Sequence, residues 1–375
     1  MPNRSTLSAA VLALTIGACQ PAPATSPAPA SPTPTQGAVA SPSAGSPAPS
    51  PAPVVSTGPS PFTVELASEP FLLPEEGPAG SVWVMPSAGA RAADGMLVLV
   101  IVWFVTDELP KVTISTSTDG TTWDVGKSHI FEGLEIGFND PGPIPSAIVQ
   151  LDDGTWQLYG WASANAGGSA FITWRTSAPA LTGPWSLDGT DLLGAGPAGD
   201  WDSFMVGAGS VLRTDAGFSM WFEGEPPGSS TRGDIGLATS TDGLTWAKRD
   251  DPATSGARFS ASDPVIQAGI CGPATAVAVE QPQVDRVGDR YVGLFGGFGP
   301  ASGQMDVFGA VSDDGQAWRC GSTEALMKSS DLGSGEGIHT IATIPLADGR
   351  IGLIAESILT DHSELWWATV SVAED

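Results

Sequence analysis

One seven-residue pattern, S-x-D-G-x-x-W, occurs three times and constrains the fold more than any other feature of the chain. The copies lie at residues 117–123, 240–246 and 312–318. Each follows a run that favours β-structure, and an Asp-Gly pair between two such runs is the strongest local signal for a hairpin. The motif therefore predicts a repeated hairpin in which Ser and Asp cap turn amides and Trp fills the space between neighbouring sheets.

The residues around these copies repeat on a larger scale. Five units can be aligned on their turns, and they begin near residues 81, 146, 210, 283 and 341. Each unit has an inner strand, a turn with Asp and Gly, and a central strand rich in apolar residues. Repeats made of about four short strands are typical of a β-propeller, because each blade hides its faces against its neighbours. We expect an all-β, five-bladed β-propeller over residues 62–375.

Two apolar segments belong to this propeller in our interpretation. The run 96–105 has about half the length of a membrane span and coincides with the second strand of the other units, so we expect a buried strand. Residues 62–73 are expected to add an edge strand that closes the ring onto the last unit.

The N-terminus has the pattern of an export signal. Arg4 precedes a short apolar stretch at 7–16, and the small residues before Cys19 resemble the lipobox of bacterial lipoproteins. That resemblance implies removal of residues 1–18 and attachment of diacylglycerol to Cys19. The alternative is an ordinary signal peptide with a chance cysteine. We expect an exported protein, lipid-anchored on the outer face of the bacterial cytoplasmic membrane or cell envelope.

Between the anchor and the propeller, residues 20–61 are Pro, Ala, Ser and Thr almost without interruption. This composition cannot bury a core and favours extended polyproline-like conformations. We therefore expect residues 19–61 to be a lipidated, disordered tether that carries no site of its own.

The charge balance excludes some partners. The chain has 15 Lys and Arg against 41 Asp and Glu, a formal net charge of −26. Such a surface repels phosphate backbones and anionic lipid headgroups, so we expect no nucleic-acid partner and membrane contact only through the lipid anchor. We expect a monomer.

Cysteine usage agrees with export. Once Cys19 is lipidated, Cys271 and Cys320 remain, and in an oxidising compartment we expect a disulfide that pins the insertion 250–275 to its blade. Two cysteines and scattered histidines are too few ligands for a zinc site, and we expect no cofactor.

The repeated pattern resembles the five-bladed propellers of glycoside hydrolase families 43 and 32 over residues 70–375. The resemblance rests on A-T-S-x-D-G-x-x-W at 238–246, D-P-V-I at 263–266 and the segments 176–179 and 181–185. It implies a carbohydrate substrate and a possible glycosidase activity. The alternative is a non-catalytic propeller that binds carbohydrate or protein at the cell surface. Sialidases share Asp-box turns, but Tyr159 and Tyr291 both lie in central strands, so sialidase activity is less expected.

Acidic residues recur where the chain enters each inner strand, and the mouth of a propeller's channel is where such entrances converge. Like charges in a confined space raise one another's pKa, and a glycosidase needs one protonated and one ionised carboxyl group. The candidates are Glu75, Glu76, Asp140, Asp200, Asp202, Glu280 and Glu336.

Among these candidates, the resemblance implies catalytic roles for Asp140 as base, Asp202 as the residue that tunes pKa, and Glu280 as acid. They come from units two, three and four, whereas the family uses its first three blades. If unit one supplies the base, Glu76 takes that place and Asp202 acts as the acid.

Substrate contacts are expected from the remaining residues at these entrances. Trp201 is the aromatic residue that we expect to stack on a sugar, with Glu76 and Glu336 beside it. The family often places a His near a central cation or water, and His339 matches that position. The resemblance therefore allows a structural cation near His339, although no set of metal ligands is assigned.

Overall fold

The computed structural model describes residues 60–106, 108–126, 130–131, 143–163, 171–228, 233–254, 256, 258–300, 303–333 and 337–373. The regular structure there is β-strand apart from four short 3₁₀ turns, η1 (Pro74–Glu76), η2 (Pro252–Thr254), η3 (Gly272–Thr275) and η4 (Ser329–Leu332). Within these ranges, no helix is long and apolar enough to cross a membrane. The all-β prediction is confirmed. The expected signal peptide, Cys19 and most of the tether lie outside the described residues.

The first three sheets are antiparallel and follow the chain in order. The first contains β2 (Ser81–Arg91), β3 (Leu97–Val105) and β4 (Lys111–Ser117). The second contains β5 (Ile144–Gln150), β6 (Trp156–Ser163), β7 (Phe171–Ala178) and β8 (Ser186–Thr190). The third contains β9 (Met205–Thr214), β10 (Gly217–Glu225), β11 (Asp234–Ser240), β12 (Ala247–Lys248) and β13 (Pro264–Ile266).

The fourth sheet has eight strands and two halves. One half is β14 (Ala278–Val287), β15 (Arg290–Phe298), β16 (Met305–Ser312) and β17 (Arg319–Cys320). The other is β18 (Gly337–Pro345), β19 (Ile351–Ile358), β20 (Ser363–Val372) and β1 (Phe62–Leu66). The halves are joined through the pair Met305–Ile338. Our prediction of five blades places these two halves in separate units.

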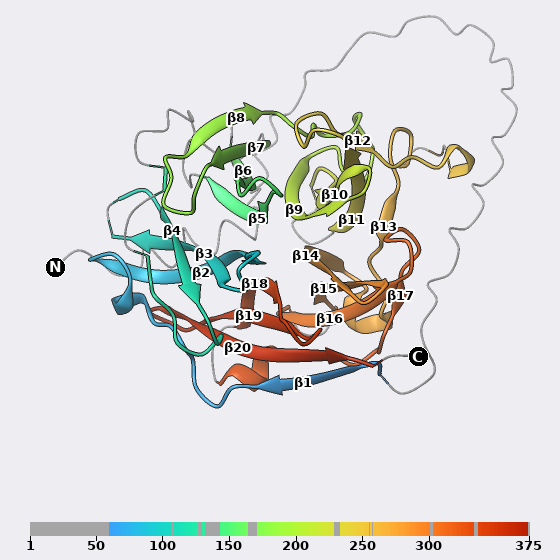
Figure 1. Ribbon diagram of the computed structural model, residues 1–375. Coiled ribbons are helices and arrows are strands. Elements are labelled where there is room, and N and C mark those ends of the chain that lie inside the picture. The colour runs from blue at the N-terminus through green and yellow to red at the C-terminus, as the bar shows by residue number, and fades with distance from the viewer. Residues whose placement is uncertain are drawn as a thin grey trace, which may run out of the picture.

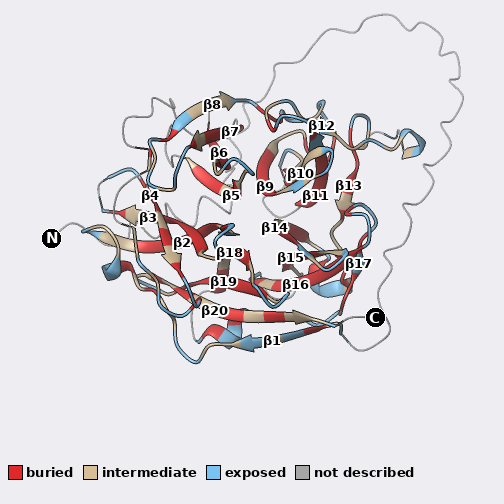
Figure 2. Ribbon diagram, viewed as in Figure 1, coloured by how far each residue is buried: buried red, intermediate tan, exposed pale blue. Residues whose placement is uncertain are grey.

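Five inner strands form a closed ring around a common centre. β2 contacts β5, β5 contacts β9, β9 contacts β14, β14 contacts β18, and β18 contacts β2 again. Figure 1 shows these strands innermost, with the later strands of each group farther out. Figure 2 shows that buried residues follow the strands and exposed residues lie mostly in the turns. This arrangement is a β-propeller.

The N-terminal strand closes the ring. β1 pairs antiparallel with β20 in a register that sets Phe62 opposite Val372 and Leu66 opposite Ala368. Farther along, Leu72 bridges to Leu365. The expected edge strand on the last unit is therefore confirmed, and β1 supplies its outermost strand from the opposite end of the chain.

The repeated motif builds its turn as predicted. Ser240 Oγ accepts the N–H groups of Asp242 and Gly243 at 3.3 and 2.8 Å. Asp242 Oδ1 accepts those of Leu244 and Thr245, both at 2.8 Å. The other two copies repeat these bonds. The glycine adopts a φ of 70°, where a side chain is disfavoured.

The motif tryptophans also pack between units, as expected. Each contacts an aromatic ring of the preceding unit, and the first contacts the last unit. The pairs are Trp246 with Tyr159 at 6.0 Å, Trp318 with Trp221 at 6.4 Å, and Trp123 with Trp367 at 6.1 Å between ring centroids. One local pattern therefore both makes the hairpin and joins neighbouring sheets.

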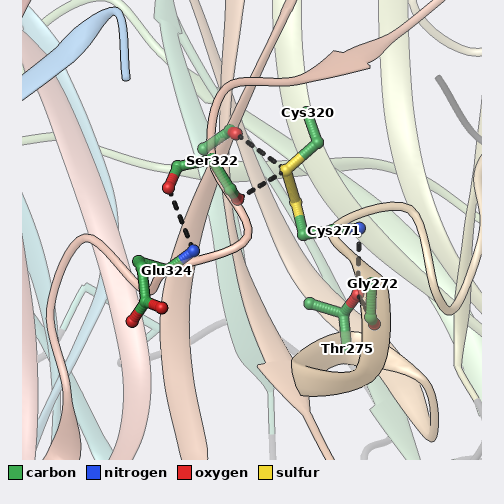
Figure 3. Close-up of a disulfide and its surroundings, with 7 residues drawn as sticks. Cys271, Gly272, Thr275, Cys320, Ser322 and Glu324 are labelled. Carbon is green, nitrogen blue, oxygen red and sulfur yellow. Dashed lines mark hydrogen bonds between the residues drawn. A yellow bond between two sulfur atoms is a disulfide. The ribbon is translucent and has the colours of Figure 1, made fainter. Parts of the chain in front are cut away.

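A disulfide ties the segment before β14 to the end of the same unit. Cys271 lies beside η3 and is bonded to Cys320 in β17, with the two Cα atoms 5.4 Å apart (Figure 3). The Cys271 N–H also donates to Thr275 Oγ1 at 3.1 Å. These are the two cysteines between which a disulfide was expected from the sequence.

Two glycine turns provide a matched test of this packing. Gly243 and Gly154 both have positive φ. A Cβ added at Gly243 would lie 2.3 Å from Tyr159 Oη and 2.8 Å from Arg175 Nη1, both in the preceding unit. A Cβ added at Gly154 would have no atom within 4 Å. We expect Gly154→Ala to lower the free energy of unfolding by about 1 kcal/mol, and Gly243→Ala by about 2–3 kcal/mol. Denaturant unfolding measures both, and equal costs would contradict the inter-unit contact.

Candidate active site

Three glutamates from neighbouring units meet near the inner strands. Glu223 and Glu225 end β10, and because alternate residues of a strand face the same side, both carboxyl groups lie on one face. Glu280 stands near the start of β14, which contacts β10. One carboxylate oxygen from each residue lies within 4.8 Å of the others. We call Glu223, Glu225 and Glu280 the acidic cluster.

A glycine allows the chain to pass beside this cluster. Gly233 precedes β11, and its carbonyl accepts the Val279 N–H at 2.9 Å. A Cβ at Gly233 would lie 2.8 Å from Glu280 Cγ and 3.0 Å from the Val279 carbonyl oxygen. The close approach of these two segments, which brings unit three against Glu280, therefore depends on the absence of a side chain.

Every inner strand carries at least one extra residue relative to the strand beside it. The shifts in register fall at Val82 and Ser87 in β2, Ser146 in β5, residues 208–209 in β9, residues 281–282 in β14 and residues 339–340 in β18. A β-bulge bends its strand and redirects side chains, and bulges are common at barrel rims and active sites. Two of these bulges place Gln281 and His339 next to each other.

Burial and mutual repulsion control protonation in the acidic cluster. Burial raises the pKa of Glu223 to about 7. Burial, together with the charge on Glu223, raises the pKa of Glu225 to about 8. Burial first, then the charges on Glu223 and Glu225, hold the pKa of Glu280 well above its usual range. Three carboxyl groups this close cannot all be ionised, so the cluster retains protons at neutral pH.

His339 is held by a buried carboxylate. Its Nδ1 lies 2.9 Å from Glu356 Oε2, and Thr340 Oγ1 donates to the same oxygen at 2.9 Å. Glu356 is 1% exposed. The His339 carbonyl oxygen accepts a hydrogen bond from Gln281 Nε2 at 2.7 Å, which connects it to the residue after Glu280. Of the predicted site residues, Glu280 and His339 are therefore brought to one end of the ring.

Cation binding at the cluster would require deprotonated carboxylates. The three glutamates could each offer one oxygen to a metal ion, and a bound cation would displace the protons that the cluster otherwise retains. The structural cation expected near His339 stays a prediction.

Asp202 occupies the other face of β10. A Cβ at Gly224 would lie 2.8 Å from Asp202 Cβ, whereas the flanking Glu223 and Glu225 point to the opposite side. The Asp202 side chain is fully buried, and its Oδ2 lies 2.5 Å from Lys248 Nζ. This geometry makes Asp202 part of an internal ion pair of unit three and does not support the role of a pKa-tuning neighbour of Glu280.

Trp201 is part of the core, and the prediction that it stacks on a sugar was wrong. Its side chain is 0% exposed and stacks on Phe222, with ring centroids 5.5 Å apart. Its indole N–H donates to the Ser262 carbonyl at 3.0 Å. The flanking aspartates suggested a polar loop, but Trp201 folds inward from that loop.

The remaining predicted residues are separate from the cluster or undescribed. Glu76 is exposed in η1, and its Oε2 accepts the Leu73 N–H at 2.8 Å, which caps that turn. Asp140 and Glu336 lie outside the described residues. The contact that Glu76 makes in the structure is therefore a local one that caps η1.

Sequence reasoning missed Glu223, Glu225 and Gln281. A signal for the first two was present, because Glu-Gly-Glu follows Trp221 and Phe222 at the end of a predicted strand. Two carboxylates with a spacing of two residues on a strand must share a face. Gln281 had no such signal, since its role depends on the neighbouring unit.

The comparisons with known proteins agree on the architecture. A family 117 glycoside hydrolase from Zobellia galactanivorans is 14% identical, with a TM-score of 0.57 over 84% of this chain and 92% of that chain. The endo-arabinase of Bacteroides thetaiotaomicron is 16% identical, with a TM-score of 0.54 over 78% and 95%. A putative glycoside hydrolase from Parabacteroides distasonis is 11% identical, with a TM-score of 0.58 over 82% and 96%.

The chain has the fold of propeller glycoside hydrolases. No family model and no curated protein matches the sequence. The resemblance inferred from the hairpin motif is thus confirmed at the level of fold, over nearly the whole length of the relatives.

The acidic cluster predicts how stability changes with pH. Its folded-state pKa values lie above those of an unfolded chain, so the folded protein binds more protons between about pH 4.5 and 8. The free energy of unfolding should therefore fall as pH rises through that window. Glu225→Gln removes one such group and should make the protein about 1–3 kcal/mol more stable than wild type at pH 8, with little difference near pH 4.5.

Denaturant unfolding at several pH values measures this difference. Glu69→Gln, which changes an exposed glutamate, is the matched control and should follow the wild type throughout. If the free energy of unfolding had the same pH dependence in Glu225→Gln and in the wild type, the surroundings would not destabilise the ionised form of Glu225.

Proposed function

We propose that the protein hydrolyses a glycosidic bond at the acidic cluster, with Glu280 as the proton donor. The observation that supports this proposal is the grouping of three half-buried carboxyl groups, of which Glu280 has a pKa well above its usual range. A glycosidase needs a carboxylic acid that is still protonated near neutral pH to protonate the leaving oxygen. The propeller fold shared with glycoside hydrolases supports the same reaction class.

In this proposal Glu223 and Glu225 raise the pKa of Glu280. They take the role that the sequence assigned to Asp202, because charge on either of them favours the protonated form of Glu280. Asp140 precedes β5 and keeps its proposed role as the base that activates water on the far side of the sugar. The substrate is a carbohydrate, either an oligosaccharide or a polysaccharide.

The proposed location follows from the N-terminal residues and the charge. Cys19 carries the lipid, and residues 20–61 hold the propeller away from the membrane. The net charge of −26 keeps the domain from binding anionic headgroups, so contact with the membrane is through the anchor. We propose that the protein acts there as a monomer on extracellular glycans.

Glu280→Gln tests the proposed proton donor. Sugar release from a panel of plant and microbial polysaccharides and aryl glycosides should identify a substrate for the wild type. The variant keeps the shape of the side chain but cannot donate a carboxyl proton, so kcat should fall by about 10²- to 10⁴-fold with little change in KM.

Glu69→Gln is again the control and should retain the wild-type rate. Undiminished turnover in a folded Glu280→Gln variant would remove Glu280 from the mechanism. No turnover by the wild type across the panel, with carbohydrate binding retained, would favour the non-catalytic binding protein.

A further inference from the structure

Gln281 has an unusual backbone conformation next to the acidic cluster. Its φ is 54°, and Asp191 is the other non-glycine residue with positive φ in the described part of the chain. This region of backbone space is disfavoured for a residue with a long side chain, and it persists where surrounding contacts enforce it. The contacts that enforce it at Gln281 come from two other units.

The side chain of Gln281 reaches β18 and brackets its bulge. Nε2 donates to the His339 carbonyl oxygen at 2.7 Å, and Oε1 accepts the Ile341 N–H at 3.1 Å. At this bulge, residues 339 and 340 lie opposite the single residue Glu356. The amide of Gln281 therefore bonds one backbone carbonyl and one backbone N–H at the bulge of β18.

The backbone of Gln281 contacts the acidic cluster directly. Its N–H donates to Glu223 Oε2 at 3.1 Å, and the residue directly follows Glu280. One residue thus connects three units: Glu223 in β10, its own strand β14 and the bulge of β18. Rotation of the Gln281 backbone out of the positive-φ region would redirect this N–H away from Glu223.

We propose that Gln281 is a positioning residue for the acidic cluster: its side-chain amide holds the bulge of β18, and this contact fixes the N–H that binds the Glu223 carboxylate. The inference rests on the proposed function for its catalytic consequence, although the contact itself is independent of activity. Among the described residues, the ionisable groups around Glu223 are Glu225 on its own strand and Glu280 on β14, with His339 and Glu356 beyond Gln281 in β18 and β19.

The chemical consequence is a division of roles among similar carboxyl groups. A backbone N–H favours the ionised form of Glu223 and opposes the effect of burial on its pKa. Charge on Glu223 in turn favours a proton on Glu280. Gln281 therefore helps to keep Glu223 ionised, and the charge on Glu223 helps to keep Glu280 protonated.

Gln281→Gly tests this role, because glycine accepts the positive φ but cannot reach β18. The titration of Glu223 is followed by ¹³C NMR of glutamate carboxyl groups, with the resonance assigned by Glu223→Gln. Without the clamp, the N–H bond to Glu223 weakens, and its titration midpoint should rise by about one pH unit. Gln281→Asn, which also tolerates positive φ and is too short to reach β18, should give the same shift.

Asp191→Gly is the control, since it relieves the same backbone conformation at an exposed site and should leave the midpoint unchanged. If the wild type cleaves glycosides, the alkaline limb of its kcat–pH profile should move to lower pH in the two Gln281 variants, because less charge on Glu223 lowers the pKa of Glu280. A purely structural role would lower the melting temperature and leave both midpoint and profile unchanged, and that result would overturn the proposal. A shifted midpoint without any glycosidase activity would uphold the positioning role and reject the proposed function.

Discussion

Closure of the ring of inner strands is the constraint on which the rest of the structure depends. Five strands, β2, β5, β9, β14 and β18, contact one another around one centre, and β1 completes the outer edge by pairing with β20. Each inner strand carries a bulge, which bends it and changes the direction of nearby side chains. The bulges of β14 and β18 bring Gln281 against the backbone of His339. The site is therefore a product of ring closure, and no single unit contains it.

The features that the sequence predicted correctly have local causes. The hairpin motif carries its own turn bonds, such as those of Ser240 and Asp242, and its tryptophan needs only a neighbouring sheet to pack against. The fold class followed from the same repeat pattern, and the edge strand β1 was expected because a propeller ring has to be closed onto its last unit. Glu280 was predicted from its place at the entrance to an inner strand, and the structure sets it among other carboxyl groups.

The features that were missed depend on contacts between distant segments. Asp202 and Glu223 are both acidic residues of unit three, and the faces of β10 separate them: one side meets Lys248, and the other meets Glu280. Sequence gives the alternation along a strand, but it does not say which face points toward the next unit. Trp201 shows the same limit, because a loop tryptophan between two aspartates is fully buried by Phe222 and Ser262.

The acidic cluster makes folding less favourable at neutral pH, and the proposed catalytic role gives a reason for that cost. The most direct measurement of the central claim is a crystal structure of Glu280→Gln with an oligosaccharide from the activity panel. Our account predicts that a glycosidic oxygen lies within about 3 Å of the amide introduced by that substitution. A sugar bound instead in the outer hollow between units two and three, at Asp152 and Arg213, would contradict it.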